Sequence, residues 1–177
     1  MSDPHDIPTP SDWVVRCAHR IPLGGLVLDV ACGNGRHARF LAGRGHPVEA
    51  VDRDPLKLAV LAGIPGIHAQ TADLESGSWP YPDGRFAGVV VVNYLHRPLF
   101  PRLLEAVAPG GTLIYETFAA GNERYGRPSN PAFLLGPGEL LEVVRGRLQV
   151  AAYEALEISE PRPAVVQRIC AINSTVS

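Results

Sequence analysis

The sequence predicts an α/β fold built on a doubly wound, mostly parallel sheet. Five short apolar runs alternate with connecting segments, most of which repeat apolar residues at helical spacing. The runs are apolar almost throughout, which is typical of strands buried on both faces of a parallel sheet. Two longer apolar segments near the end of the chain indicate a terminal hairpin.

The first elements follow a loose, proline-rich arm. Ser11 is a candidate cap for a short helix over 11–21. The continuous apolar run at 26–30 predicts the first strand. Residues 35–45 then repeat small and apolar side chains at helical spacing, and Gly45 is a typical helix end.

The next unit repeats this strand and helix order. An apolar run predicts a strand over 47–52. A helix is expected over 54–64, because Asp54 is a good cap and Pro55 suits the first helical position. A short third strand is expected over 66–73.

The second half of the parallel sheet begins after a loop of clustered turn residues at 76–86. The most apolar run of the chain predicts a strand over 87–94. A helix is expected over 98–107, then a turn at 109–111 and a fifth strand over 112–118.

The segment 119–138 shows no clean period. An irregular stretch of about 20 residues is uncommon inside a domain and is usually functional or disordered. A helix is expected over 139–146. The last two strands, 148–158 and 164–173, form the terminal hairpin.

Composition and length limit the class of protein. The 177 residues favour one domain, with 46% hydrophobic and 19% charged residues. A net charge of −2 gives no basic field for nucleic acid or an anionic membrane. Cys17, Cys32 and Cys170 lie far apart, without the CxxC spacing of a zinc site or the pattern of a disulfide framework. We therefore expect no metal and a reducing, cytoplasmic location.

The chain is expected to divide into a flexible arm (1–10), one domain (11–173) and a short tail (174–177). The polar, proline-rich start does not resemble a secretory signal. No apolar run approaches the length of about 18 residues that suggests a membrane span.

Ligands of such sheets bind beyond the carboxyl ends of the strands. The first strand ends at a glycine loop in which Gly33 and Gly35 leave room for a ligand. Asp52 ends the second strand 19 residues after Gly33, where a carboxylate accepts the ribose hydroxyls of an adenosine. Asp73 after the third strand offers an acceptor to the amine of a base, unless it is a solvated loop acid.

Polar or aromatic side chains also follow the fourth and fifth strands. They are Asn93, Tyr94 and His96, and then Glu116, Thr117 and Phe118. Five such strand ends in one crevice predict a nucleotide-type site more strongly than any single motif.

Together these stretches resemble the class I S-adenosylmethionine (SAM)-dependent methyltransferases. Within that family the chain is most similar to the small, stand-alone, tellurite-resistance-like enzymes. The resemblance covers roughly residues 11 to 173 and implies a Rossmann-like sheet of seven strands with the last strand antiparallel. The stretches that carry it are VLDVACGNGRHA, VEAVDRD, TADL, GVVVVNYLHRPL and LEAVAPGGTLIYETF.

The resemblance implies roles for individual residues. The first loop would hold the methionine part of SAM, with its ammonium near Asp29. Asp52 would take the ribose hydroxyls, Arg53 would flank the adenine, and Leu74 would pack on its ring beside Asp73. Asn93 would face the ammonium and the methyl group. The cofactor-binding set is Asp29, Ala31, Gly33, Asn34, Gly35, Asp52, Arg53, Asp73, Leu74 and Asn93.

Methyl transfer from SAM depends mainly on alignment and desolvation. A base is required only for a protonated acceptor such as a phenol, and His96 and Tyr94 are the catalytic candidates. His96 is otherwise an ordinary loop histidine. Trp13 and Phe118 are candidate walls of the methyl site, although Trp13 is otherwise a core residue.

The irregular segment 119–138 would lie over the substrate. It carries Arg124, Tyr125 and Arg127, which suit a small anion, or else form a solvated surface. The expected acceptor is a small molecule: a thiol, a chalcogen oxyanion or a hydroxyl. NYLH stands where the resemblance would place NPPY or DPPY in enzymes that methylate bases, which argues against nucleic acid.

Two other functions remain open. The spacing G-x-G-x-x-A over 33–38 also fits a nicotinamide-dependent reductase. Against it, Asp29 precedes the loop, a second nucleotide-binding half is missing, and Lys57 is the only lysine. A non-enzymatic SAM-binding protein is the second alternative. Nothing in the sequence indicates an oligomeric state.

Overall fold

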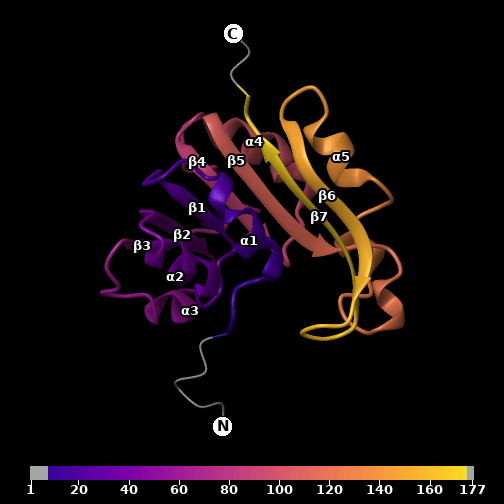
Figure 1. Cartoon of the computed structure of the whole chain (residues 1–177). Coiled ribbons are helices and arrows are strands. Elements are labelled where there is room, and N and C mark those ends of the chain that lie inside the picture. The colour runs from indigo at the N-terminus through magenta and orange to yellow at the C-terminus, as the bar shows by residue number, and fades with distance from the viewer. Residues whose placement is uncertain (1–7, 175–177) are drawn as a thin grey trace.

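A seven-stranded sheet in the order β3-β2-β1-β4-β5-β7-β6 forms the centre of the molecule (Figure 1). The computed structural model describes residues 8–174. β1 to β5 are parallel, whereas β7 is antiparallel to both β5 and β6. This arrangement confirms the expected fold class. The strands are β1 (Val27–Val30), β2 (Val48–Asp52), β3 (Ile67–Thr71), β4 (Phe86–Val92), β5 (Val107–Phe118), β6 (Gln149–Ile158) and β7 (Ala164–Ile172).

The strand order reverses beside β1. Asp29 of β1 pairs with Ala50 of β2 on one side and with Val90 of β4 on the other. The chain therefore runs outward from β1 to β3, crosses back, and runs outward again through β4 and β5. This switch point opens a crevice at the carboxyl ends of the strands.

Helices cover both faces of the sheet (Figure 1). Along β4 the apolar side chains alternate between two separate cores: Val90 packs with Trp13 and Leu41 on one face, and Val91 packs with Leu103 on the other. The first face carries α1 (Asp12–Cys17), α2 (Arg36–Gly43) and α3 (Pro55–Ala59). The second carries α4 (Phe100–Ala106) and α5 (Glu139–Val144).

Several helices are shorter than the sequence predicts. α1 passes into a 3-10 turn, η1 (Ala18–Arg20), and α4 is preceded by another, η2 (Arg97–Leu99). α3 begins as expected, because the Asp54 carboxylate accepts the Leu56 N–H, but its regular part ends at Ala59. The sequence pattern shows only which face of each segment is apolar. A short helix or a single 3-10 turn can bury that face as well as a longer helix can.

β5 is longer than expected. Val107 already pairs with Phe86, and the register then shifts before Gly88 pairs with Thr112. The expected turn at 109–111 is thus an irregularity within the strand. A Cβ on Gly111 would come within 3.0 Å of three backbone oxygens, so only glycine fits there.

The segment 119–138 lies against the rest of the fold. It contains two 3-10 turns, η3 (Asn122–Arg124) and η4 (Pro131–Phe133). Arg97 donates hydrogen bonds to the carbonyls of Ala132 and Leu134. Its irregular character is as expected, and these contacts order it.

The expected arm and tail fall largely outside the described residues, at 1–7 and 175–177. Within the described chain, no helix has both the length and the apolar character needed to cross a membrane.

Candidate cofactor and acceptor site

A cavity of about 480 Å³ lies at the carboxyl ends of the five parallel strands. Its size is in the usual range for small-ligand sites. The residues expected at the site that line it are Ala31, Gly33, Asp52, Arg53, Asp73, Leu74, Asn93, Tyr94 and Phe118. Thr117, named above among the strand-end residues, also lines it. The lining residues that sequence reasoning did not single out are Val51, Lys57, Ala72, Glu75, Leu95, Pro128 and Phe133.

The glycine loop uses its two glycines differently. Gly33 has φ +56° and lines the cavity, and a Cβ there would meet nothing within 4 Å. Gly35 has φ +76°, and a Cβ there would come within 2.5 Å of the Leu61 side chain. Gly33 therefore leaves space for a ligand, whereas Gly35 permits close packing below α2. Asn34 and Gly35 are not among the cavity-lining residues.

Backbone strain is concentrated at the cavity. In the part of the chain that the structure describes, Ala31 (φ 50°) and Asn93 (φ 56°) are the non-glycine residues with positive φ, and both line the cavity. Such conformations cost on the order of 1–3 kcal/mol and cluster at functional sites. The Asn93 N–H donates to the Glu116 carbonyl, which fixes the end of β4 on β5.

Asp52 is held in place at the end of β2. One carboxylate oxygen accepts the Gly33 N–H at 2.8 Å, and the other accepts the Asp54 N–H at 2.9 Å. The glycine loop and Asp52 thus position each other. Asp54 is the helix cap, as expected, which leaves the remaining lone pairs of Asp52 free beside the cavity.

Asp29 lies beneath the loop and is 1% exposed. Its Oδ2 has no hydrogen-bond partner among the described residues. Burial raises the pKa of this carboxyl to about 7, against the opposing effect of the Ala38 N–H. Asp29 does not line the cavity itself, and it differs from Asp52 in being buried with one oxygen unsatisfied.

Asp73 forms a turn as well as lining the cavity. It accepts hydrogen bonds from the Ser76 hydroxyl at 2.6 Å and from the Glu75 N–H at 3.0 Å. The Ser76 contact is the main reason why the pKa of Asp73 is lowered. The carboxylate is therefore ionised at neutral pH and retains acceptor capacity for a base amine.

The two base candidates meet at Glu75, which sequence reasoning missed. The Tyr94 hydroxyl donates to Glu75 at 3.1 Å, and Nδ1 of His96 lies 3.9 Å from the same carboxylate. Burial, followed by the charge of Glu75, raises the pKa of Tyr94. Tyr94 and Glu75 line the cavity, whereas His96 does not. Glu75 follows Asp73 in a loop, a position with no sequence signal.

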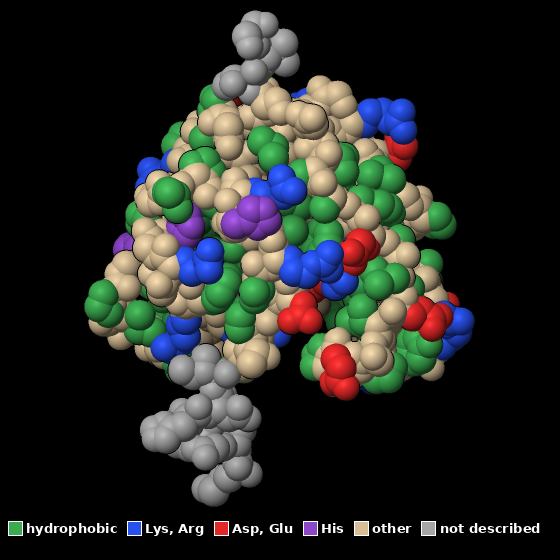
Figure 2. Space-filling view, viewed as in Figure 1, with side chains coloured by type: hydrophobic (Ala, Val, Ile, Leu, Met, Phe, Trp, Pro, Cys, Tyr) green, Lys and Arg blue, Asp and Glu red, His purple; other side chains and the backbone are tan. Residues whose placement is uncertain are grey.

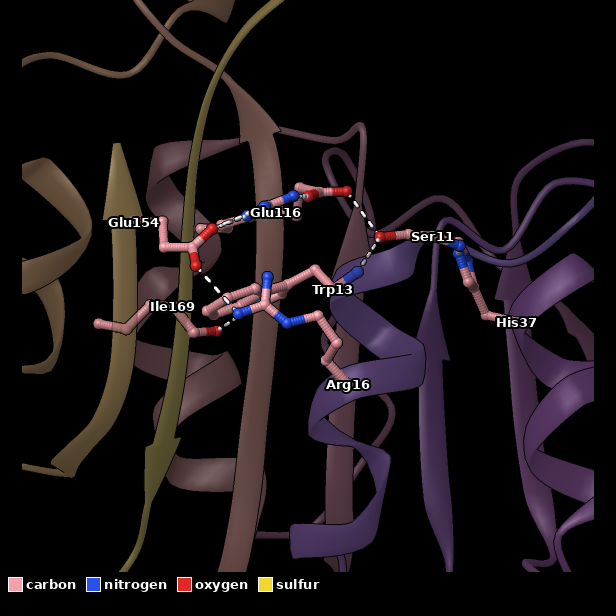
Figure 3. Close-up of polar contacts among 8 residues, drawn as sticks. Ser11, Trp13, Arg16, His37, Glu116, Glu154 and Ile169 are labelled. Atoms are coloured by element: carbon pink, nitrogen blue, oxygen red, sulfur yellow. Dashed lines mark hydrogen bonds and ion pairs between the residues drawn. The ribbon is translucent and has the colours of Figure 1, made fainter. Parts of the chain in front are cut away.

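Trp13 is a core residue rather than a wall of the cavity (Figure 3). It is 1% exposed, and its indole N–H donates to the Ile169 carbonyl at 3.1 Å. The guanidinium carbons of Arg16 and Arg168 each lie 5.0 Å from its ring. These contacts fix α1 on the sheet, so Trp13 takes the core position that was the alternative to a wall of the methyl site.

A polar network joins α1 to the ends of α2 and β5 (Figure 3). The Ser11 hydroxyl donates to Glu116 at 2.7 Å, and the Ser11 N–H donates to Nε2 of His37 at 3.1 Å. Burial lowers the pKa of His37 to about 3, so it is a neutral acceptor. Arg168 holds the second oxygen of Glu116.

The expected anion-binding group at 124–127 does not line the cavity. Arg124 and the Tyr125 hydroxyl both bind Glu157 of β6, 33 and 32 residues further along the chain. Arg127 is exposed, and the neighbouring Pro128 lines the cavity instead. On the face shown in Figure 2, basic and acidic side chains are intermixed, without a continuous basic area.

Comparison with known sequences agrees with this site. Residues 27–111 match the family model described as a methyltransferase domain. Trans-aconitate 2-methyltransferase of Rhizobium meliloti is 33% identical over 94 residues, which cover 50% of this chain and 37% of that protein. Phthiotriol/phenolphthiotriol dimycocerosates methyltransferase 1 of Mycobacterium ulcerans is 33% identical over 119 residues, or 61% and 43% of the two chains. The chain matches less than half the length of these relatives.

Solved structures show the same fold. TehB from Haemophilus influenzae is similar with a TM-score of 0.74 at 18% identity, over 92% of this chain and 62% of that one. The 1,6-didemethyltoxoflavin-N1-methyltransferase of Burkholderia thailandensis, solved with S-adenosylhomocysteine, has a TM-score of 0.72 at 17% identity, over 98% and 80%. Residues 27–111 thus match a methyltransferase domain, and the chain has the fold of these solved methyltransferases, which agrees with the expected resemblance to class I SAM-dependent methyltransferases.

Proposed function

We propose that the chain transfers a methyl group from SAM to a small-molecule acceptor, without a nucleic-acid or membrane partner, in the cytoplasm. The observation that carries the proposal is the cavity itself. It joins the ends of all five parallel strands, and Asp52 is fixed there by the backbone of the glycine loop. Such a preorganised carboxylate suits the two hydroxyls of a ribose.

The residues present fit SAM. Gly33 leaves open space at the cavity, Asp73 offers an acceptor for the adenine amine, and Arg53 and Leu74 line the same end. The unsatisfied oxygen of Asp29 suits an ammonium group, which would favour the ionised carboxylate. When bound, SAM supplies an activated sulfonium methyl group.

The protein itself would contribute by aligning the acceptor with the methyl group and by excluding water from the cavity. The acceptor's lone pair forms a bond to the methyl carbon while the methyl–sulfur bond breaks, and that electron pair stays on sulfur. A thiolate or an oxyanion needs no base. For a hydroxyl acceptor we propose Glu75 as the proton acceptor, because the Tyr94 hydroxyl, with its raised pKa, is itself a donor to Glu75. We propose that His96, whose Nδ1 lies 3.9 Å from Glu75, orients that carboxylate from outside the cavity.

Thermal unfolding with SAM, S-adenosylhomocysteine or NADPH tests the proposal. SAM and S-adenosylhomocysteine should each stabilise the protein, by about 2.7 kcal/mol at 100 times the dissociation constant. Asp52→Ala should abolish this shift. Asp54→Ala is the matched control, because it removes only a helix cap and should keep the shift.

The competing functions give different results. Stabilisation by NADPH alone would favour the reductase. SAM binding with no labelled product from thiols, selenite, tellurite or phenols would favour the non-enzymatic SAM-binding protein.

A further inference from the structure

The acceptor end of the cavity has an apolar, largely aromatic lining. If the proposed function holds, SAM takes the end formed by β1, β2 and β3, and the acceptor takes the end formed by β4, β5 and the segment 119–138. That end is lined by Tyr94, Thr117, Phe118, Pro128 and Phe133, none of which is charged, and the one carboxylate that borders it is Glu75, which accepts the Tyr94 hydroxyl. An acceptor that fills it therefore has an apolar and preferably flat body.

A cation lies beside this lining. Arg162 belongs to the connection between β6 and β7, which Figure 1 shows at the edge of the sheet where β5 ends. Its guanidinium carbon is 5.9 Å from the centre of the Phe118 ring. Phe118 lines the cavity and pairs with Val166 of β7. The guanidinium does not line the cavity itself, but it lies over an aromatic ring that the acceptor would touch.

Arg162 is available for a ligand, unlike three other arginines of this region. Arg97 is held by Glu139 and two carbonyls, and Arg124 is held by Glu157. Arg168 is held by Glu116 and Glu154. Arg162 makes no ion pair or hydrogen bond with the residues at 8–174 and is exposed. A guanidinium resting on an aromatic ring keeps its N–H fork directed outward for a planar anion.

We propose that Arg162 selects the acceptor by binding a carboxylate on it while the acceptor's apolar body rests on Phe118 and Phe133. The substrate class is then a small, flat, apolar molecule that carries a thiol or hydroxyl and, at its other end, a carboxylate. This inference deepens the proposed function and rests on it. The carboxylate group is not consumed, so methyl transfer balances as described above.

Two matched thiols test the selection: 3-mercaptobenzoate and its methyl ester, which share the ring and the thiol and differ in charge. Binding of each is measured by saturation-transfer NMR with S-adenosylhomocysteine present, and methylation by mass spectrometry of the thioether. The wild type should favour the acid by about tenfold, the scale of one charge-assisted hydrogen bond. Arg162→Ala should bind the two probes equally, and Arg162→Lys should retain part of the preference.

Two other arginines serve as controls. Arg147 is exposed just before β6, at the other end of that strand from the β6–β7 connection, and Arg127 is exposed next to Pro128. Arg147→Ala should leave the preference unchanged. If Arg127→Ala removes the preference and Arg162→Ala does not, the anion is bound from the segment 119–138 and the inference is wrong. Equal weakening of both probes in Arg162→Ala would likewise overturn it, because Arg162 would then only support Phe118.

The failure of this inference can be separated from failure of the proposed function. A wild type that is stabilised by SAM but binds acid and ester equally contradicts the role of Arg162 alone. A wild type that SAM does not stabilise contradicts the proposed function, whatever the ratio between the two probes.

Discussion

Two aspartates at the ends of neighbouring strands have opposite environments. Asp52 accepts two backbone N–H groups and lines the cavity. Asp29 is buried with one unsatisfied oxygen, and burial raises its pKa to about 7. The Asp52 environment suits a neutral hydroxyl. The Asp29 environment suits a cationic group, whose positive charge would offset the cost of ionising the buried carboxyl.

The raised pKa of Asp29 predicts that the free energy of unfolding of the ligand-free protein depends on pH. The folded state holds this proton more tightly than the unfolded chain, so stability falls as pH rises from about 4 to about 7. Asp29→Asn removes the ionisation cost and adds a buried amide NH2 with two N–H donors. It should stabilise the ligand-free protein by about 2 kcal/mol at pH 8 and not at pH 4.

Urea unfolding of both proteins between pH 4 and pH 8 measures this difference. The variant should also lose the thermal shift with SAM. The contrary result is an Asp29→Asn variant that is less stable than the wild type by the same amount at pH 8 and at pH 4. Asp29 would then be ionised and satisfied without a ligand.

Residues at strand ends were predictable from the sequence because apolar runs and turn residues mark where strands stop. Asp52, Asp73, Asn93 and Phe118 line the cavity for that reason. Partners distant in sequence were not predictable. The core position of Trp13 was one of two alternatives, but its partner, the Ile169 carbonyl 156 residues away, could not be read from the sequence.

The same reason explains the other differences at the site. Arg124 faces Glu157 because the β6–β7 hairpin folds beside it, and Glu75 reaches the cavity because the crossover after β3 turns back over Tyr94. Both depend on tertiary contacts, and neither residue lies in a pattern with a fixed period.

At the scale of an element, the two glycines of the glycine loop have different roles: Gly33 leaves space for a ligand, and Gly35 allows close packing. Gly33→Ala should cost about 1 kcal/mol from its left-handed backbone, with its methyl group directed into open space at the cavity. Its main effect should be weaker SAM binding. Gly35→Ala has the same backbone cost and also meets the buried Leu61 side chain, so about 2–4 kcal/mol is expected.

Gly43 is the matched control for both variants. It lies in α2, and a Cβ there would meet nothing within 4 Å. Gly43→Ala should stabilise the protein by about 0.5–1 kcal/mol, because alanine favours a helix. Thermal unfolding with and without SAM measures all three, and equal losses of stability for Gly33→Ala and Gly35→Ala would contradict the assignment.

At the scale of the whole molecule, one network joins the start of the described chain to its last strands (Figure 3). Ser11 binds Glu116 of β5, Arg168 of β7 binds both Glu116 and Glu154 of β6, and Arg16 of α1 binds Glu154. The carbonyl of Glu116 also accepts the Asn93 N–H at the cavity. The position of α1 is therefore linked to the wall of the site.

Arg168→Ala tests this link. It leaves the 8%-exposed Glu116 with only the Ser11 hydroxyl as a partner, and an unpaired buried charge costs about 3–5 kcal/mol. Arg145→Ala removes an exposed pair with Glu142 and should change little. Urea unfolding measures the stability of both variants.

A second measurement follows the position of α1. In a Trp79→Phe background the fluorescence of Trp13 reports whether α1 is packed on the sheet, and Arg168→Ala should shift its emission to longer wavelength before global unfolding. A loss below about 1 kcal/mol would show that water reaches Glu116 and that α1 is held by Trp13 packing alone.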